Sequence, residues 1–304
     1  MTGIKEYMHY LNECPNCYLQ ESMRVVFSNG LHFTDERTVM CLNCGLVFIN
    51  PRLANIKNFY GSDDYSNLIR EGETPSEHVK KRTAALAGYR MKLLKDYLPE
   101  SGTHIEIGSG SGYLAKAIQD RTNMRVVGIE PSPGFANWSK EEHGIEVLVE
   151  EFPCDLTHIE DIQSVSLIHV LEHFTNPFWV LDNISSLLPT GGKFILEYPD
   201  LMQALERQRV EGGAFEARTY FQKSHLFDFY FGVLAPELMM RKFKISQIFV
   251  FETFPLDKNV LIVMDKQTKI PPMEDDAWLS EEQKMGAFDY IRSSVEPVQA
   301  TVSE

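Results

Sequence analysis

Apolar residues recur with two different periods along residues 74–199, and the two periods alternate. Residues 79–97 carry them at helical spacing, behind a start in which Thr74 can cap the helix, Pro75 suits its first position and Glu77 can reach back to the cap. Farther on, short apolar runs of strand length alternate with helical stretches. The predicted strands are 104–107, 125–129, 145–149, 165–170 and 193–198, and the predicted helices are 113–121, 134–143 and 177–188.

The alternation ends after residue 198. A polar, helix-prone stretch over 200–222 and an aromatic run over 225–231 lead to a predicted helix near 236–243 and to two strands, 245–252 and 260–264. Two strands without a helix between them predict a hairpin at one edge of a sheet. Together the elements predict an α/β fold: a doubly wound, mostly parallel, Rossmann-like sheet with helices on both faces and an antiparallel last strand.

Changes in composition divide the chain into three parts. Residues 1–73 carry a cluster of cysteines and end near a polar, glycine-containing run, so we expect a small separate lobe there. Residues 74–266 hold the predicted α/β domain. Residues 267–304 form an acidic extension that we expect to be peripheral, with one amphipathic helix over 280–292.

Charge and hydropathy narrow the classes of partner. The chain of 304 residues has a formal net charge of −14, which repels a phosphate backbone and disfavours nucleic acid as a partner. No apolar run of about 18 residues is present, so we expect no membrane span. The N-terminal segment lacks the basic start and apolar stretch of a signal peptide, and we therefore expect a cytoplasmic protein.

A glycine loop directly follows the predicted strand 104–107. Gly108, Gly110 and Gly112 let the chain turn sharply in front of a helix, whose N-terminus favours an electronegative ligand. The spacing is G-x-G-x-G, whereas the dinucleotide motif places its third glycine one residue later. Glu130 closes the next strand 22 residues after Gly108, where a carboxylate can accept both hydroxyls of a ribose. The combination predicts a nucleoside ligand; a nicotinamide dehydrogenase is the alternative enzyme class, disfavoured by the glycine spacing.

The runs E-I-G-S-G-S-G (106–112) and G-I-E-P-S (128–132) resemble the class I S-adenosylmethionine-dependent methyltransferases, as do the stretches 169–177 and 188–192. The likeness spans about 103–264. It implies S-adenosylmethionine as cofactor, with the glycines along its methionine part, Glu130 at the ribose and residues 151–152 near the adenine. The cofactor-binding residues that the resemblance implies are Glu106, Gly108, Gly110, Gly112, Glu130, Pro131, Glu151, Phe152 and His169.

Four of the five cysteines form two C-x-x-C pairs separated by 23 residues: Cys14 with Cys17, and Cys41 with Cys44. This spacing is typical of a four-thiolate zinc site, and a small lobe with little core gains stability by closing on a metal ion. Four thiolates fill the tetrahedron and leave no position open for chemistry, so the zinc would be structural. A redox dithiol or free thiols are the alternatives.

The run 41–52 resembles the zinc-binding segment of methyltransferases of bacterial sugar and polysaccharide biosynthesis, including deoxysugar C-methyltransferases. That resemblance covers about 14–65. It implies a small-molecule acceptor, an activated sugar such as a nucleotide-sugar, or another polysaccharide or glycan precursor. It also places Tyr65 near the substrate, although packing of the lobe on the catalytic domain explains this tyrosine as well.

The candidate catalytic residues are His225, His173 and Tyr65. His225 is the preferred general base, because the segment 225–229 resembles the histidine–aromatic stretch of the sugar C-methyltransferases and a neutral imidazole suits proton removal. Ser224 stands where that group often has an acidic residue, so carbon, oxygen and nitrogen acceptors all stay open. Packing among aromatic residues is the alternative role for His225.

Two further alternatives are open. His169, Glu172, His173 and His225 offer nitrogen and oxygen ligands that could hold a divalent cation. The whole chain could instead be a zinc-bearing interaction module on a catalytically inactive methyltransferase-like scaffold, which the intact glycine loop and Glu130 argue against.

Overall fold

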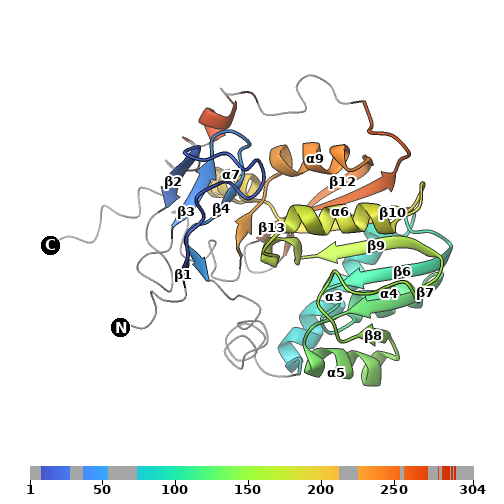
Figure 1. The fold of residues 1–304 in the computed structure, drawn as a ribbon. Helices are drawn as coiled ribbons and strands as arrows, with labels where there is room; N and C mark the ends of the chain where they lie inside the picture. The colour runs from blue at the N-terminus through green and yellow to red at the C-terminus, as the bar shows by residue number, and fades with distance from the viewer. Residues whose placement is uncertain are drawn as a thin grey trace.

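A computed structural model describes most of the chain (Figure 1). The described residues are 8–27, 37–53, 74–211, 225–253, 257–272, 280, 283–287, 289 and 291. Within these ranges, none of the helices is both long enough and apolar enough to cross a membrane.

The larger sheet of the described region has seven strands and holds the centre of the molecule. They are β6 (Ser101–Ile107), β7 (Asn123–Ile129), β8 (Glu146–Leu148), β9 (Ile162–Ile168), β10 (Lys193–Pro199), β12 (Phe243–Thr253) and β13 (Asp257–Lys266). Their spatial order is β12-β13-β10-β9-β6-β7-β8. In this order the strands β10, β9, β6, β7 and β8 run parallel, while β13 is antiparallel to both β10 and β12. The predicted doubly wound sheet with an antiparallel edge hairpin is therefore confirmed.

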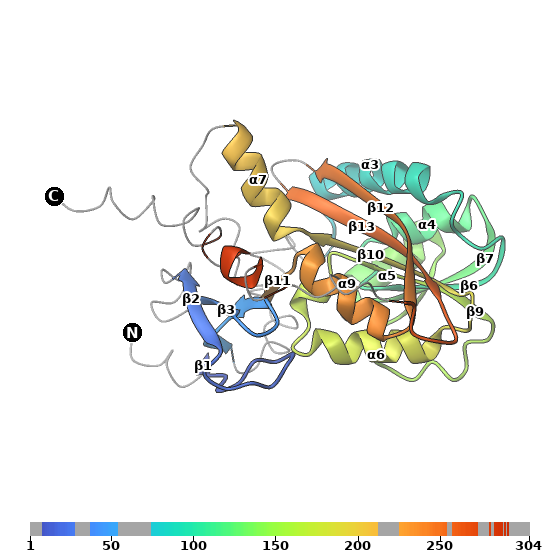
Figure 2. The same cartoon turned by 90° about the horizontal axis from the view of Figure 1, so that it is seen from above.

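Helices cover both faces of this sheet (Figure 2). On one face lie α3 (Glu77–Leu94), α4 (Tyr113–Gln119) and α5 (Pro133–His143), which share one buried apolar cluster with β7 and β8. On the other lie α6 (Pro177–Leu187) and α9 (Phe231–Met240), which pack into a second cluster. A further helix, α7 (Leu201–Glu211), contacts β13.

Two helix boundaries differ from the sequence-based prediction. The first long helix begins at Glu77 because the Ser76 hydroxyl caps it, accepting from the Val79 N–H at 3.3 Å, so the prediction that Thr74 is the cap was wrong. The helix expected near 236–243 starts earlier and contains Pro236 in its interior. Its first residues belong to the apolar run, where burial of Val233 and Leu234 outweighs the local signal of the proline.

A smaller sheet lies beyond the carboxyl ends of the parallel strands in both ribbon views. Its strands are β2 (Met23–Phe27), β3 (Thr38–Cys41), β4 (Val47–Ile49) and β11 (Phe227–Asp228), in the order β11-β4-β3-β2. Beside it, β1 (Met8–His9) pairs with β5 (Arg52–Leu53). The sheet therefore combines strands of the cysteine-bearing segment with one strand that follows β10 in the chain.

The acidic C-terminal extension also contributes to this region. Residues 283–287 are helical, and both Ala287 and Ile291 are buried in the same apolar cluster as Val47 and Phe48. The expectation of a peripheral extension therefore does not hold for Ala287 and Ile291, whose spacing of four residues fits the amphipathic helix expected over 280–292.

Candidate active site

The order of the strands places a crevice at the ends of β6 and β9. From β6 the chain proceeds through α4 to β7, on one side of β6, whereas β9 lies on its other side. Ligands of open α/β sheets bind at such a switch point, outside the carboxyl ends of the strands. Three predicted site segments converge there, because the glycine loop follows β6, Glu130 follows β7 and His169 follows β9.

The three glycines of the loop have positive φ angles, 69° at Gly108, 52° at Gly110 and 72° at Gly112. A side chain at Gly108 would lie 2.5 Å from Val170, and one at Gly112 would overlap Ser139, so close packing alone explains both glycines. A Cβ at Gly110 would meet none of the described atoms within 4 Å. Gly110 therefore faces open space, where a ligand can approach the backbone.

Glu130 is fixed beside this loop. Its side chain is fully buried, and its two oxygens accept backbone N–H groups, Oε2 from Gly110 at 2.8 Å and Oε1 from Ser132 at 2.9 Å. An ionised carboxylate has about four acceptor positions, so it can hold several donors at once. The carboxylate thus lies directly against the open position at Gly110.

Glu106, on β6 just before the loop, is buried and its Oε2 has no hydrogen-bond partner in the described structure. Burial raises its pKa to about 8, which the positive charge of Arg90 and the Ala115 N–H counteract only in part. An unsatisfied buried carboxyl oxygen under a glycine loop is costly unless a ligand donates to it.

The residues expected near the adenine, and the proline that follows Glu130, lie at the same edge of the sheet. Glu151 is exposed and Phe152 is buried, and both follow the end of β8. Pro131 is exposed ahead of α5. Tyr65 lies outside the described residues, and its predicted place near the substrate stays a prediction.

A buried ion-pair network that the sequence analysis missed supports His169. Arg90 on α3 donates two hydrogen bonds to Glu197 on β10, from Nε to Oε2 at 2.7 Å and from Nη2 to Oε1 at 2.6 Å. The His169 Nε2 lies 3.0 Å from the same Oε1. Burial alone would raise the pKa of Glu197, but Arg90 outweighs it and holds this pKa at about 2. The only signal in the sequence was a charged residue inside an apolar strand.

His169 itself has φ 54°, an unusual angle that turns the chain at the end of β9. Burial lowers its pKa, but the carboxylates of Glu197 and Glu172 outweigh burial and raise it. His169 therefore sits between two carboxylates rather than among apolar residues.

The structure brings His173 and His225 together. Glu172 and His173 lie in a short 3-10 turn, η2 (Leu171–His173), and the two imidazole rings have centroids 5.0 Å apart. The Leu226 N–H donates to the Glu172 carbonyl at 2.9 Å, which holds His225 beside this turn. Burial, with His173 and His169 nearby, lowers the pKa of His225 well below its usual range, so its ring is neutral near pH 7.

The segment that follows His225 pairs with a strand of the cysteine-bearing lobe. The Ile49 N–H donates to the Leu226 carbonyl at 3.0 Å, and Phe227 pairs with Phe48 across β11 and β4. His225 is thus placed by a strand of the smaller sheet, in which β3 ends at Cys41 and the β3–β4 connection carries Cys44.

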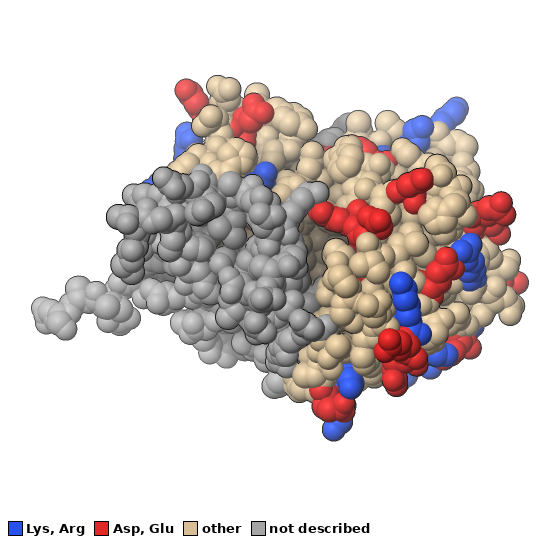
Figure 3. Space-filling model, turned by 60° about the horizontal axis from the view of Figure 1, so that its bottom comes forward, with Lys and Arg blue, Asp and Glu red and all other residues tan. Residues whose placement is uncertain are grey.

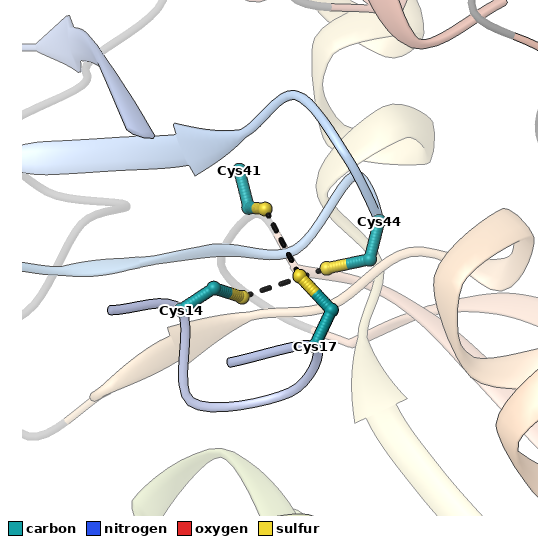
Figure 4. A group of neighbouring side chains, drawn as sticks. All are labelled: Cys14, Cys17, Cys41 and Cys44. Carbon is teal, nitrogen blue, oxygen red and sulfur yellow. Dashed lines mark hydrogen bonds between the residues drawn. The ribbon is translucent and has the colours of Figure 1, made fainter. Parts of the chain in front are cut away.

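The four clustered cysteines point their sulfurs toward one another (Figure 4). The Sγ atoms of Cys14 and Cys44 lie 3.6 Å apart, as do those of Cys17 and Cys41, far beyond the length of about 2.05 Å of a disulfide bond. Zinc–sulfur bonds of about 2.3 Å place tetrahedral sulfurs about 3.8 Å apart. The arrangement therefore fits four thiolate ligands around one zinc ion.

Comparison with known proteins agrees with this geometry. The family described as "Methyltransferase domain" matches residues 78–233, half of the chain. This chain belongs to that methyltransferase family. The matched residues lie in the α/β domain, from α3 to α9. No curated protein matches the sequence.

Solved structures of other proteins are similar to this chain at low sequence identity. Magnesium protoporphyrin IX methyltransferase from Synechocystis PCC 6803, with bound S-adenosylhomocysteine, is 15% identical, with a TM-score of 0.50 over 70% of this chain and 98% of that one. The same enzyme with bound S-adenosylmethionine gives 12% identity and a TM-score of 0.49 over 70% and 95%. The PH0226 protein of Pyrococcus horikoshii OT3 gives 16% and 0.49 over 69% and 99%.

Proposed function

We propose that this methyltransferase moves the methyl group of S-adenosylmethionine to a small molecule bound beside His173 and His225. The observation that carries the proposal is the open backbone position at Gly110 with the Glu130 carboxylate fixed against it at the switch point of the sheet. A tight turn that only packs a helix on a strand needs neither feature.

The residues around the crevice suit the parts of this cofactor. S-adenosylmethionine supplies a methyl carbon already activated by a sulfonium. In our proposal Gly108, Gly110 and Gly112 line the methionine part, and the Glu130 carboxylate binds the ribose hydroxyls. The unsatisfied oxygen of Glu106 suits a donor such as an amino group, while Glu151 and Phe152 flank the adenine.

The acceptor side needs a group that takes or displaces a proton. Lowering of the His225 pKa by burial keeps its imidazole neutral, as proton removal requires. His173, with its ring 5.0 Å from that of His225, lies on the same side. We propose that the acceptor loses its proton beside His225, while His169 is held in place by Glu197.

We propose an activated sugar or polysaccharide precursor as the acceptor, bound through oxygen or carbon. The similarity of residues 14–65 to sugar-modifying methyltransferases supports this class. Charge supports a small molecule over nucleic acid, because Lys and Arg are interspersed with Asp and Glu on the face seen in Figure 3 and the net charge is −14. The cysteine cluster is proposed to hold a structural zinc ion.

Calorimetry with S-adenosylhomocysteine tests the cofactor site. The wild-type protein should bind it, and Glu130→Ala should weaken binding by about 1.5–3 kcal/mol through loss of charge-assisted hydrogen bonds. Glu146→Gln, an exposed change on β8, is the control and should bind as the wild type does. Heat from NADH but none from S-adenosylhomocysteine would favour a dehydrogenase, and no heat from either would favour the inactive scaffold.

Mass spectrometry tests the acceptor class. Nucleotide-sugars incubated with enzyme and S-adenosylmethionine should gain the mass of one methylene group. A protein that binds the cofactor but leaves every nucleotide-sugar unchanged would refute the sugar proposal while leaving the methyltransferase proposal intact.

A further inference from the structure

Three side chains at the acceptor side converge on one point. Glu172, His173 and His225 each offer a ligand atom, and these atoms all lie within 4.8 Å of one another. Glu172 and His173 come from η2 after β9, whereas His225 is brought in by the segment that pairs with the smaller sheet. The convergence depends on the tertiary fold, because neighbours on one turn cannot supply the third member.

Glu172 lacks the partners that its burial requires. Its side chain is 1% exposed, and neither Oε1 nor Oε2 has a hydrogen-bond partner in the described structure. The nearest basic atoms are the His169 Nδ1 at 3.7 Å and the His173 Nε2 at 4.0 Å, beyond hydrogen-bond length. A buried carboxylate that accepts no hydrogen bond is unfavourable, and the two histidines act on it only from 3.7 and 4.0 Å. A positive charge between Glu172 and the histidines would remove this cost.

The surroundings add a second unsatisfied acid. Asp228 is 3% exposed and its Oδ2 has no partner among the described residues. Among the described residues, no Lys or Arg forms an ion pair with either acid, and the nearby Arg90 is paired with Glu197. The site thus combines buried carboxyl oxygens that accept no hydrogen bond with two imidazole rings that offer ligand nitrogens, which favours a cation over an anionic ligand.

From these contacts we infer that Glu172, His173 and His225 bind a divalent metal ion, separate from the cysteine cluster. Ligand bonds of about 2.0–2.2 Å put two atoms on one ion at most about 4.4 Å apart, so the 4.0 Å between Glu172 and His173 suits a shared ion. Two histidines and one carboxylate leave coordination positions open. The three ligands are borderline to hard, and manganese, iron, cobalt or zinc suits them.

This inference rests on the proposed methyl transfer and refines the role of His225 there, from a free base to a metal ligand. An acceptor hydroxyl in an open position would have its pKa lowered by the ion. Its proton leaves to solvent, the oxygen forms a bond to the methyl carbon and the carbon–sulfur bond breaks. S-adenosylhomocysteine is released, and no oxidant or reductant takes part. The site therefore favours oxygen acceptors.

Manganese binding tests the site without any acceptor. Mn²⁺ is chosen because thiolates prefer softer metals, so the cysteine cluster does not compete for it. Zinc-replete full-length protein is titrated with Mn²⁺, and the free ion is measured by electron paramagnetic resonance. The wild type should bind one ion, and Glu172→Gln should weaken binding at least about 100-fold, because even the loss of outer-shell partners costs 10–100-fold. Glu146→Gln is the matched control and should bind normally.

A second variant keeps the test decisive if Glu172→Gln does not fold. His173→Gln removes a half-buried ligand, and it should weaken Mn²⁺ binding to a similar degree with an unchanged circular dichroism spectrum. Wild-type protein that binds no Mn²⁺, or both ligand variants binding it normally, would overturn the inference. Calorimetry with S-adenosylhomocysteine on the same preparations keeps the outcomes distinct. Cofactor binding without Mn²⁺ binding would refute the metal site alone. Mn²⁺ binding without cofactor binding would refute the proposed function.

Discussion

The cofactor side and the acceptor side of the site are built in different ways. On the cofactor side, the glycine loop and Glu130 follow two adjacent parallel strands of one sheet and are joined by the bond from Gly110 to Glu130. On the acceptor side, His225 meets Glu172 only because the next residues pair with β4 of the smaller sheet. The cofactor side therefore depends on the α/β sheet, while the acceptor side also depends on the lobe that carries the cysteines.

Loss of a zinc ligand should give the largest difference between the two sides, because it should disrupt the acceptor side and leave cofactor binding intact. In Cys44→Ser the lobe loses a structural ion, whose apparent binding free energy in small zinc domains is about 10–16 kcal/mol. We expect the lobe to become sensitive to protease and methyl transfer to fall to background, while affinity for S-adenosylhomocysteine stays within about threefold. Zinc content by elemental analysis, limited proteolysis and calorimetry measure these effects. Cys154→Ser, outside the cluster, should retain zinc; equal zinc content in Cys44→Ser would contradict the site.

Removal of the His225 side chain should damage only the acceptor side. His225→Ala is expected to lower kcat by about 10²–10⁴, the usual contribution of a group that assists proton transfer. Affinity for S-adenosylhomocysteine should change less than about twofold, because Glu130 and the glycine loop are untouched. A variant with full turnover would assign His225 to packing alone.

Three glycine variants can distinguish packing from ligand approach on the cofactor side. Gly108→Ala adds a positive-φ penalty and a clash with Val170, so we expect a loss of about 2–4 kcal/mol in the free energy of unfolding. Gly110→Ala should lose only about 1–2 kcal/mol, yet bind S-adenosylhomocysteine more weakly.

Gly144→Ala is the strain-only control for these variants. Its φ of 66° is similar and its Cβ would meet none of the described atoms within 4 Å, but it lies at the C-terminus of α5 rather than in the loop. It should match Gly110→Ala in urea denaturation and the wild type in calorimetry. Equal cofactor affinity of the two variants would show that no ligand approaches Gly110.

The smallest expected effect lies in the sheet that both sides share. His104 on β6 is fully buried between the Ser164 and Ser166 hydroxyls, and burial lowers its pKa to about 3. The unfolded chain takes up a proton near pH 6.5 and the folded one does not, so stability is complete above pH 6.5 and falls as the pH drops toward 3. From pH 7.5 to 5 the loss from this residue is about 2 kcal/mol.

Urea denaturation at the two pH values measures this effect. In His104→Gln the difference in unfolding free energy between pH 7.5 and pH 5 should be smaller than in the wild type by that amount. An identical pH dependence in both proteins would mean that His104 is protonated in the folded state.

Local signals were sufficient for the sheet but not for the network around His169. The apolar runs that became β6, β7, β9 and β10 are short and bounded by polar turns. Their length and their boundaries are enough to identify them as buried strands. Arg90 and Glu197 lie 107 residues apart, and neither shows a spacing that would pair them. Their ion pair forms because α3 packs across the sheet, a contact no sequence period encodes.

In the C-terminal extension two local signals had different outcomes: the apolar spacing predicted an amphipathic helix over 280–292, and 283–287 are helical. Its acidic composition predicted a peripheral segment, but Ile291 is fully buried. Average charge describes solvation of a whole segment, whereas burial depends on which few side chains meet an apolar surface. That surface includes strands of the smaller sheet, which the local pattern did not predict to lie nearby.

The sequence by itself determined the parallel sheet, the glycine loop with its acid on the next strand, and the pairing of the four cysteines in two short motifs. Each of these depends on residues close together in the chain or on adjacent strands, where backbone geometry fixes the distance. Only the tertiary structure decided that β11 joins the cysteine-bearing sheet and that His225 meets the unsatisfied carboxylate of Glu172. Such contacts arise because the smaller sheet and the α/β domain bury apolar side chains in one shared cluster, and that burial is a property of surfaces rather than of any segment.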